Sequence, residues 1–261
     1  MSIRCAVATT LCCLLILGAT CCSEAQETTK KTDSATVIGN FVSFLGGEMP
    51  LRGLDRYQVH GTFSGDHTGE FEVRFFEGKH LVMSDTEGQL SIEYSGFDGQ
   101  RYWQANERTG QYLDDPAAVE GSLEVYGLHY LALRWLDRLD TLPEPESVLI
   151  DDEPGWVLRF SYENGDQKEH YFDRETGRLV KTIRIRGERN REYRFIYSTK
   201  RIDGIVFVAR VEFEIESQTS RGRRIRRSQL NVEHIDFDTP LDEVDVRIPP
   251  GLPLGNKDES K

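Results

Sequence analysis

Residues 205–216 read IVFVARVEFEIE, a stretch in which apolar and charged side chains alternate. Every second residue from Ile205 to Ile215 is apolar, and these residues share one face of a strand, because successive side chains in a strand point to opposite faces. The glutamates that alternate with them share the other face. A long strand with a single apolar face is typical of an antiparallel sheet that covers a core on one side and meets water on the other.

The same two-residue period recurs before and after this strand. Turn signals such as Asp98-Gly99 and Asp203-Gly204 separate the periodic runs. Strands at a spacing of about ten residues, joined by such turns, indicate an antiparallel meander. In the strand near 224–237 the apolar phase changes between Val232 and Ile235, which predicts a β-bulge. Further periodic runs lie at 57–63, 71–75, 90–94 and 156–162.

Two segments have the period of a helix. Residues 34–45 repeat apolar side chains at helical spacing and are followed by Gly46-Gly47, which predicts a short amphipathic helix. Residues 116–139 carry two apolar stripes, and a helix of this kind usually packs between two surfaces. We expect one mainly β domain of the α+β class, with about 10–11 antiparallel strands in a highly curved sheet and helices against its concave side.

The beginning of the chain has the pattern of a secretory signal peptide, since Arg4 precedes an apolar run that ends in small residues. We expect residues 1–25 to be removed, residues 26–33 to form a disordered linker, and the protein to be exported without a transmembrane span. All five cysteines lie within the first 22 residues, so the mature chain would lack disulfides and cysteine nucleophiles. Alternatively, acylated Cys21 anchors the protein to a membrane.

Composition and spacing exclude several kinds of chemistry. The net charge of −12 argues against nucleic-acid binding, which needs a basic surface. The six histidines lack metal-site spacing, and although His60 and His170 could meet across strands, we expect them on the solvent face. Acidic residues could serve a hydrolase, but nothing in the sequence pairs two of them as such an enzyme requires. We therefore expect no catalytic residue, no metal and no cofactor.

One basic cluster, RGRRIRR at 221–227, stands out in this acidic chain. It could bind an anionic lipid headgroup or an acidic partner. More often, arginines at the exposed tip of a hairpin prevent edge-to-edge aggregation. The arginines of the cluster are Arg221, Arg223, Arg224, Arg226 and Arg227.

The order of several segments resembles the periplasmic lipoprotein-carrier superfamily, which includes the LolA- and LolB-like outer-membrane lipoprotein-sorting proteins. The likeness extends over residues 34–250. The segments that carry it are GFDGQRYW (96–103), YFDRETGRLVK (171–181), RFIYSTKRIDGIVFVARVEF (194–213) and LNVEHIDFDTPLDEVDVRIPP (230–250).

This resemblance implies an unclosed antiparallel β-barrel with a helical lid, here residues 116–139, over a hydrophobic cavity that shelters acyl chains. It also implies a periplasmic protein of the cell envelope that is not an enzyme, and we expect residues 251–261 to form a flexible tail. The carriers latch their lid with one arginine, for which Arg134 is a candidate. The aromatic residues expected to line the cavity are Phe71, Phe75, Trp103, Tyr130, Trp135, Trp156, Phe207 and Phe213.

Two functions fit these features. The first is binding and transport of a lipid or lipoprotein acyl chain, driven by burial of hydrocarbon at about 0.8 kcal/mol per methylene. The alternative is a self-filled domain that uses a sheet edge or the arginine cluster to bind an envelope protein, since aromatic side chains suit a filled core as well as a cavity wall. The substitution Trp135→Asp separates them: a lid over a cavity would fold with it, whereas a filled core would not.

Overall fold

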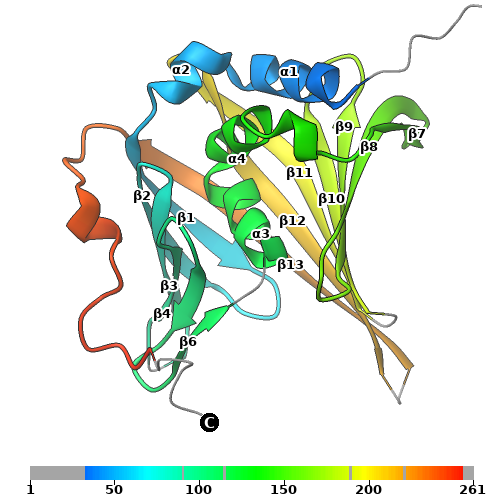
Figure 1. The fold of residues 1–261 in the computed structure, drawn as a ribbon. Helices are drawn as coiled ribbons and strands as arrows, with labels where there is room; N and C mark the ends of the chain where they lie inside the picture. Colours follow the sequence, from blue (N-terminus) through cyan, green and yellow to red (C-terminus); the bar gives the residue numbers. More distant parts are fainter. Residues whose placement is uncertain (1–32, 90, 114–115, 188–189, 220–221, 255–261) are drawn as a thin grey trace, which may run out of the picture. The chain divides into compact units, whose positions relative to one another are not determined.

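The computed structural model describes residues 33–89, 91–113, 116–187, 190–219 and 222–254, and most of them lie in strands (Figure 1). The strands of the first half are β1 (Arg56–Ser64), β2 (Gly69–Phe76), β3 (Lys79–Thr86), β4 (Glu93–Phe97), β5 (Tyr102–Ala105) and β6 (Gly110–Leu113). Those of the second half are β7 (Glu146–Ile150), β8 (Glu153–Ser161), β9 (Gln167–Asp173), β10 (Leu179–Arg186), β11 (Asn190–Ile202), β12 (Ile205–Thr219) and β13 (Gly222–Asp236).

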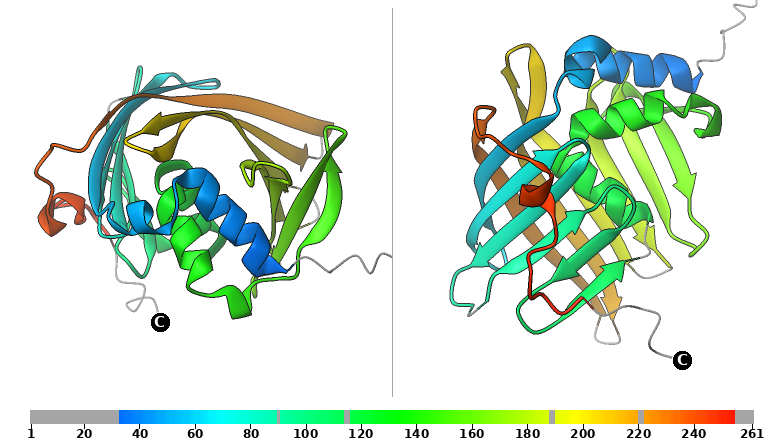
Figure 2. Two further views of the ribbon diagram at one scale, coloured as in Figure 1. Left: turned by 90° about the horizontal axis from the view of Figure 1, so that it is seen from above. Right: turned by 60° about the vertical axis from the view of Figure 1, so that its left-hand side comes forward.

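These 13 strands form one antiparallel sheet in the order β6-β5-β4-β3-β2-β1-β13-β12-β11-β10-β9-β8-β7. Neighbours in the sheet are neighbours in the chain, except that β1 pairs with β13. The sheet curls but does not close (Figure 2), which confirms the predicted unclosed antiparallel barrel. It has more strands than the 10–11 expected because β5, β6 and β7 contain only four or five residues each, too few for a clear alternation.

Four α-helices accompany the described strands: α1 (Ser34–Leu45), α2 (Glu48–Arg52), α3 (Pro116–Tyr126) and α4 (Leu128–Leu136). Short 3-10 helices occur at Leu139–Thr141 and at Glu243–Val246. The view from above in Figure 2 shows α1, α3 and α4 inside the curl of the sheet, and we call the face that they cover the concave face. The positions of the helices on the concave side confirm the expected arrangement.

The first helix has clear start and stop signals. The Asp33 carboxylate accepts a hydrogen bond from the Thr36 backbone N–H at 2.8 Å and so caps the helix. The helix ends at Gly46, whose φ of 130° disfavours any residue with a side chain. A Cβ at Gly46 would also lie 2.6 Å from the Gly204 carbonyl oxygen. Glycine therefore lets the end of α1 approach the turn before β12.

The prediction of one continuous helix over residues 116–139 is wrong, because Gly127 separates two helices, α3 and α4. Gly127 has a φ of −137°, which lies outside the helical range. A Cβ there would lie 3.0 Å from side-chain atoms of both Leu123 and Phe75. The break gives the two helices different directions (Figure 1).

The hydrophobic core lies between the concave face and the helices. Phe41 of α1 packs edge-to-face on Phe172 of β9 with ring centroids 5.4 Å apart, and it also contacts Trp135 of α4. A second, smaller cluster lies on the opposite, convex face, where Leu81 and Trp103 are buried. The C-terminal segment covers that cluster, and Leu254 bridges to Gly110 of β6.

The predicted bulge in the last strand is confirmed. His60 of β1 pairs with His234, but the next residue, Gly61, pairs with Val232. Glu233 is therefore the extra residue, and it explains the change of phase seen in the sequence. A Cβ at Gly61 would lie 2.1 Å from the Asn231 carbonyl oxygen, so the strands meet most closely next to the bulge.

Candidate functional site

A buried carboxylate fastens α3 to the second half of the sheet. Glu124 is only 1% exposed, and its Oε1 lies 2.5 Å from Lys168 Nζ and 2.7 Å from His170 Nε2. Its Oε2 lies 2.8 Å from Arg194 Nη1 and accepts a hydrogen bond from the Thr182 hydroxyl at 3.1 Å. Side chains from β9, β10 and β11 therefore converge on one helical residue. We call these five residues the Glu124 cluster.

The charges in this cluster balance one another. Burial alone would raise the pKa of the Glu124 carboxyl, but Lys168, Arg194 and His170 outweigh burial and hold that pKa well below its usual range. Arg194 also forms an ion pair with Glu192 at 2.7 Å. The carboxylates of Glu124 and Glu192 thus balance the permanent positive charges of Lys168 and Arg194. Removal of one partner would leave an uncompensated buried charge, which is strongly destabilising.

Helix α3 is also attached to the first half of the sheet. The Tyr57 hydroxyl of β1 donates a hydrogen bond to the Tyr126 carbonyl oxygen at 2.5 Å. His80 Nε2 of β3 lies 2.5 Å from the Ser122 hydroxyl oxygen. The helix therefore bridges both halves of the curled sheet with polar contacts.

The expectation that the histidines face solvent is wrong for His80, His129 and His170, which are all at most 3% exposed. Their strand and helix positions fall on the inward face, which composition alone does not reveal. Burial lowers the pKa of His80 and of His129 to about 3, so both imidazoles are neutral at ordinary pH. His60 pairs with His234 and does not meet His170. No cluster of metal-ligating side chains occurs among the described residues.

Helices and aromatic side chains fill most of the space inside the curl. The cavity beside Tyr57, His129 and Phe207 has a volume of about 20 Å³, which is too small for a hydrocarbon chain. Phe75, Trp135 and Phe207 belong to this packed core, and Tyr130 and Trp156 pack at its margin.

Open space remains at the end of the concave face that lies below the C-terminus of α3. It is a groove of about 430 Å³, which we call the arginine groove. Phe71, Tyr126 and Leu230 supply apolar wall, and Arg226 stands at the border. The other lining residues are Phe63, Asp66, His67, Ser84, Thr86, Gln89, Glu93, Ile215, Arg227 and Ser228.

The register of the β12–β13 hairpin decides where its arginines point. Val211 and Leu230 are paired, and both belong to the concave core. Directly opposite residues share a face, so Arg226, opposite Ile215, and Arg224, opposite Ser217, are also on the concave face.

The other described arginines of the cluster are on the convex face, where carboxylates neutralise them. Arg223 pairs with Glu216 at 2.7 Å, and Arg227, which also borders the groove, pairs with Glu214 at 2.9 Å. By contrast, Arg224 forms no ion pair with any residue that the structure describes, and Arg226 has only Asp66 at 3.9 Å. Arg221 lies outside the described residues.

The eight aromatic residues expected to line one cavity are therefore separated. Of these, Phe71 lines the arginine groove. Phe213 lies under the Arg194 guanidinium, 5.3 Å from its ring centroid. Trp103 lies on the opposite face of the sheet, under the C-terminal segment, because β5 directs Tyr102 to the concave side and Trp103 to the convex side.

The residues that hold α3 were not singled out by the sequence. Arg134 forms no ion pair with a described residue, and Arg194 is the arginine that binds the helix. A signal for this arrangement existed, since Glu124 stands between the apolar residues Leu123 and Val125 in α3. A second signal was the alternation in β9, which directs Lys168 inward together with Phe172.

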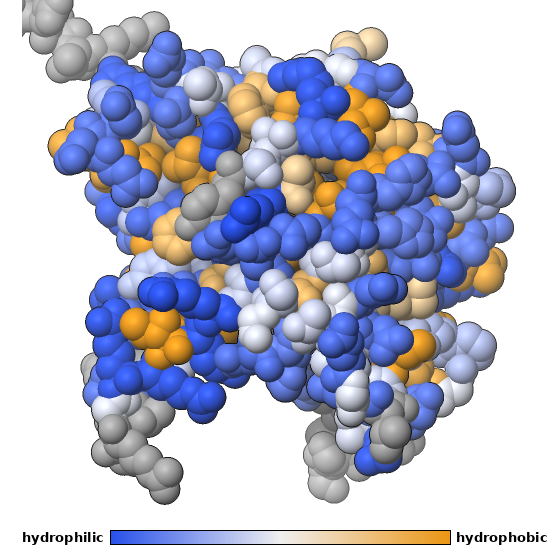
Figure 3. All heavy atoms as spheres, turned by 180° about the vertical axis from the view of Figure 1, so that it is seen from behind, coloured by the Kyte–Doolittle hydropathy of each residue, from blue (hydrophilic) through white to orange (hydrophobic). Residues whose placement is uncertain are grey.

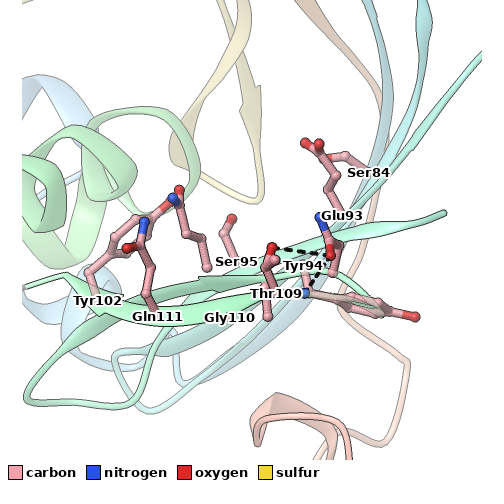
Figure 4. A pocket seen from close by; sticks show the side chains of 11 residues that line it. Ser84, Glu93, Tyr94, Ser95, Tyr102, Thr109, Gly110 and Gln111 are labelled. Carbon is pink, nitrogen blue, oxygen red and sulfur yellow. Dashed lines mark hydrogen bonds between the residues drawn. The ribbon is translucent and has the colours of Figure 1, made fainter. Parts of the chain in front are cut away.

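A second pocket of about 430 Å³ adjoins the arginine groove over β4, β5 and β6 (Figure 4), and we call it the polar shelf. Ser84 and Glu93 line both spaces, so the two spaces adjoin each other. In the register, Ser95 is opposite Gln104, and Gln104 is opposite Gln111. The remaining lining residues are Tyr94, Tyr102, Ala105, Asn106, Thr109 and Gly110.

Charged and polar side chains dominate the outer surface. Seen from behind, that surface is mainly hydrophilic, with hydrophobic side chains in small separate groups (Figure 3). None of the described helices is both long enough and apolar enough to cross a membrane.

The sequence matches no protein-family model and no curated protein. Solved structures do match. A LolA superfamily protein from Nitrosomonas europaea is 14% identical with a TM-score of 0.52, over 83% of this chain and 99% of that one. A DUF1329 family protein from Desulfovibrio piger is 10% identical with a TM-score of 0.46, over 83% of this chain and 98% of that one. The first of these likenesses supports the fold: the described residues have a LolA-like fold, as the resemblance predicted.

Proposed function

We propose that this chain is an exported binding protein, not an enzyme, and that it binds an anionic amphiphile in the arginine groove. The observation that carries the proposal is the pair Arg224 and Arg226. Both arginines are on the concave face of β13, and Arg226 lines the groove beside its apolar wall. Arg226 has one long ion pair, with Asp66 at 3.9 Å, and Arg224, two residues before it in the strand, forms no ion pair with a described residue.

The apolar part of the ligand would contact Phe71, Ile215 and Leu230. These side chains come from three different strands and line the groove together. Most of the curl is already filled, and the groove leaves room for hydrocarbon against this wall. Transfer of hydrocarbon from water to this wall would contribute about 0.8 kcal/mol per buried methylene.

The anionic part of the ligand would bind at Arg224 and Arg226. Guanidinium groups form charge-assisted hydrogen bonds with phosphate or carboxylate oxygens. In a protein with a net charge of −12, two arginines on one face with a single long ion pair between them and the described carboxylates favour an anion over its surroundings. A lipid or an acylated protein combines the required hydrocarbon with an anion.

A titration with matched lysolipids tests the proposal. Myristoyl lysophosphatidylglycerol is added to the purified protein below its micelle concentration, and binding is measured by calorimetry. Zwitterionic myristoyl lysophosphatidylcholine serves as the comparison. We expect the anionic lipid to bind more tightly and the difference to shrink as salt is added.

Variants of the hairpin make the test specific. The double variant Arg224→Gln/Arg226→Gln removes both positive charges from the concave face of β13. It should weaken binding of the anionic lipid about tenfold, as expected for the loss of two exposed charge contacts. Arg223→Gln changes the same type of residue on the convex face of the same strand and should leave binding unchanged. The proposal would be refuted if neither lipid binds, or if both variants lose the same affinity for the anionic lipid. An acidic peptide that binds while lipids do not would favour the protein-partner alternative.

A further inference from the structure

We infer that the polar shelf binds a sugar or another cyclic polyol, so that the ligand is an anionic lipid with a hydroxyl-rich headgroup. This inference rests on the proposed function, because the lipid is what brings the headgroup to the shelf. The observation behind it is the composition of the shelf and its position next to the arginine groove, with which it shares Ser84 and Glu93.

The lining of the shelf is polar but nearly uncharged. Glu93 is the one charged residue among the 11 that line it, whereas 29% of the whole chain is charged. Elsewhere on this sheet, exposed polar positions carry ion pairs such as Arg159–Glu169 and Arg210–Glu212. These water-exposed positions of the sheet carry charged side chains. The lining of the shelf is neutral, so exposure to water does not explain it.

The side chains of the shelf form an ordered row. Ser95, Gln104 and Gln111 follow one another across β4, β5 and β6 at directly opposite positions, about 5 Å apart from strand to strand. In Figure 4, Ser95 and Gln111 project to the same side of the strands. Tyr102 and Ser84 border the same space, and the side chains of Tyr102 and Ser95 hydrogen-bond to each other.

The row has unused hydrogen-bonding capacity. The side chains of Gln104 and Gln111 form no hydrogen bond with any residue that the structure describes, whereas Asn106 is occupied by the turn that it caps. An amide side chain presents donors and an acceptor side by side, and a hydroxyl group is both a donor and an acceptor. A ring that carries several hydroxyls therefore matches alternating amides and hydroxyls.

The charge of the shelf indicates which part of the ligand binds there. Among the described residues, no lysine, arginine or histidine lines it, so these residues offer no cation to a phosphate or carboxylate there. The anion belongs instead at Arg226, which lines the adjoining arginine groove, and at Arg224, two residues before it on the same face of β13. The anionic part of one headgroup would thus bind in the arginine groove, and its neutral part would bind on the polar shelf.

Two lipids with the same acyl chain and the same phosphodiester charge test this division. Myristoyl lysophosphatidylinositol carries a polyhydroxylated ring, and myristoyl lysophosphatidylglycerol carries a short polyol without a ring. We expect the purified wild-type protein to bind the inositol lipid about tenfold more tightly, as additional hydrogen bonds of ordinary strength would produce.

The variant Gln104→Ala/Gln111→Ala should reduce this preference to within about twofold and leave the affinity for the glycerol lipid unchanged. Gln58→Ala, on the convex face of β1, is the matched control and should keep the preference. If wild type binds both lipids equally, or if the double variant weakens both to the same extent, the polyol site is refuted while the arginine groove stands. If neither lipid binds, the proposed function and this inference fail together.

Discussion

The carboxylate of Glu124 lies 2.8 Å from the guanidinium of Arg194, although 70 positions separate the two residues in the chain. Glu124 belongs to the helix that follows the first meander, and Arg194 belongs to a central strand of the second. Both charges are largely removed from water, so they are stable only together. This pair fixes the position of α3, and α3 in turn borders the arginine groove through Tyr126.

Loss of the Glu124 carboxylate should destabilise the protein more than loss of a surface ion pair. Glu124→Gln leaves Lys168 and Arg194 buried with insufficient negative charge, and we expect the free energy of unfolding to fall by about 3–5 kcal/mol. The double variant Glu124→Gln/Lys168→Met should recover part of this loss because it removes one of the unpaired charges. Urea unfolding followed by circular dichroism measures both values.

The ion pair between Arg159 and Glu146 is the control for that experiment, since both side chains are at least 41% exposed. Glu146→Gln should cost at most about 1 kcal/mol. Equal costs for Glu124→Gln and Glu146→Gln would contradict the assignment of a buried, charge-balanced cluster.

Stability should fall with acidification because His80 and His129 are buried in neutral form. Each has a folded-state pKa of about 3 against 6.5 in the unfolded chain. Below pH 6.5 the unfolded chain therefore binds protons that the folded protein does not. The free energy of unfolding should decrease from about pH 6.5 towards pH 3, at up to about 1.4 kcal/mol per pH unit for each histidine.

His129→Phe tests this assignment without a large change of packing, because His129 already contacts the rings of Tyr57 and Phe75. Between pH 6 and 5 its slope of stability against pH should be smaller than that of wild type by up to about 1.4 kcal/mol per unit. His67→Gln, at an exposed position, should keep the wild-type slope. A His129→Phe slope equal to that of wild type would refute the burial of a neutral imidazole.

Trp135 should behave as a core residue. It is 3% exposed and stacks on Phe160 at 5.9 Å, and its ring meets the edge of His170 at 4.7 Å. We expect Trp135→Ala to lower the free energy of unfolding by about 3–5 kcal/mol and Trp135→Asp to prevent folding. Trp156→Ala, at the margin of the core, should cost clearly less. A folded Trp135→Asp protein with an unchanged urea midpoint would indicate an open cavity instead.

The C-terminal segment should protect the strands that carry the polar shelf. Leu252 and Leu254 cover Trp103 on the convex face of β5. Leu252→Asp should lower stability by about 1–2 kcal/mol, because it replaces apolar contact with a charge, and should speed hydrogen exchange in β4–β6. Val244→Asp is the control, since Val244 is 64% exposed in the same segment. Unchanged exchange in the Leu252→Asp protein would show that the segment is not a structural cover.

The sequence predicted those elements whose pattern is long enough to read. The 15-residue strand β12, the amphipathic α1 and the bulge opposite His60 follow from periodicity within one segment. Prediction from the sequence failed for features that depend on residues far away in the chain. At the break between α3 and α4, the space for a Cβ on Gly127 is taken by Phe75 of a distant strand, and the four-residue strand β5 gave no basis for placing Trp103 on the convex face.

The candidate site was predictable only in part. The arginine cluster and Phe71 were both singled out, but their meeting in one groove depends on the β1–β13 pairing, which no local pattern encodes. The Glu124 cluster was missed because a buried charge is recognised by its partners, and these lie in β9, β10 and β11. The polar shelf was missed because uncharged side chains carry no strong signal in a sequence.

The pairing of β1 with β13 also governs how the chain folds. It joins residues as distant as Thr62 and Glu233, which are 171 positions apart, whereas every other strand pair joins neighbours in the chain. Each meander can form from local hairpins, but the seam between them must wait for the final strand and carries the largest loop-closure entropy. A chain that stops before β13 would therefore leave two unpaired edges, on β1 and on β12, in the middle of what should be a continuous sheet. Such edges are templates for aggregation, so integrity of the last strand protects the protein from misassembly as much as it completes the fold.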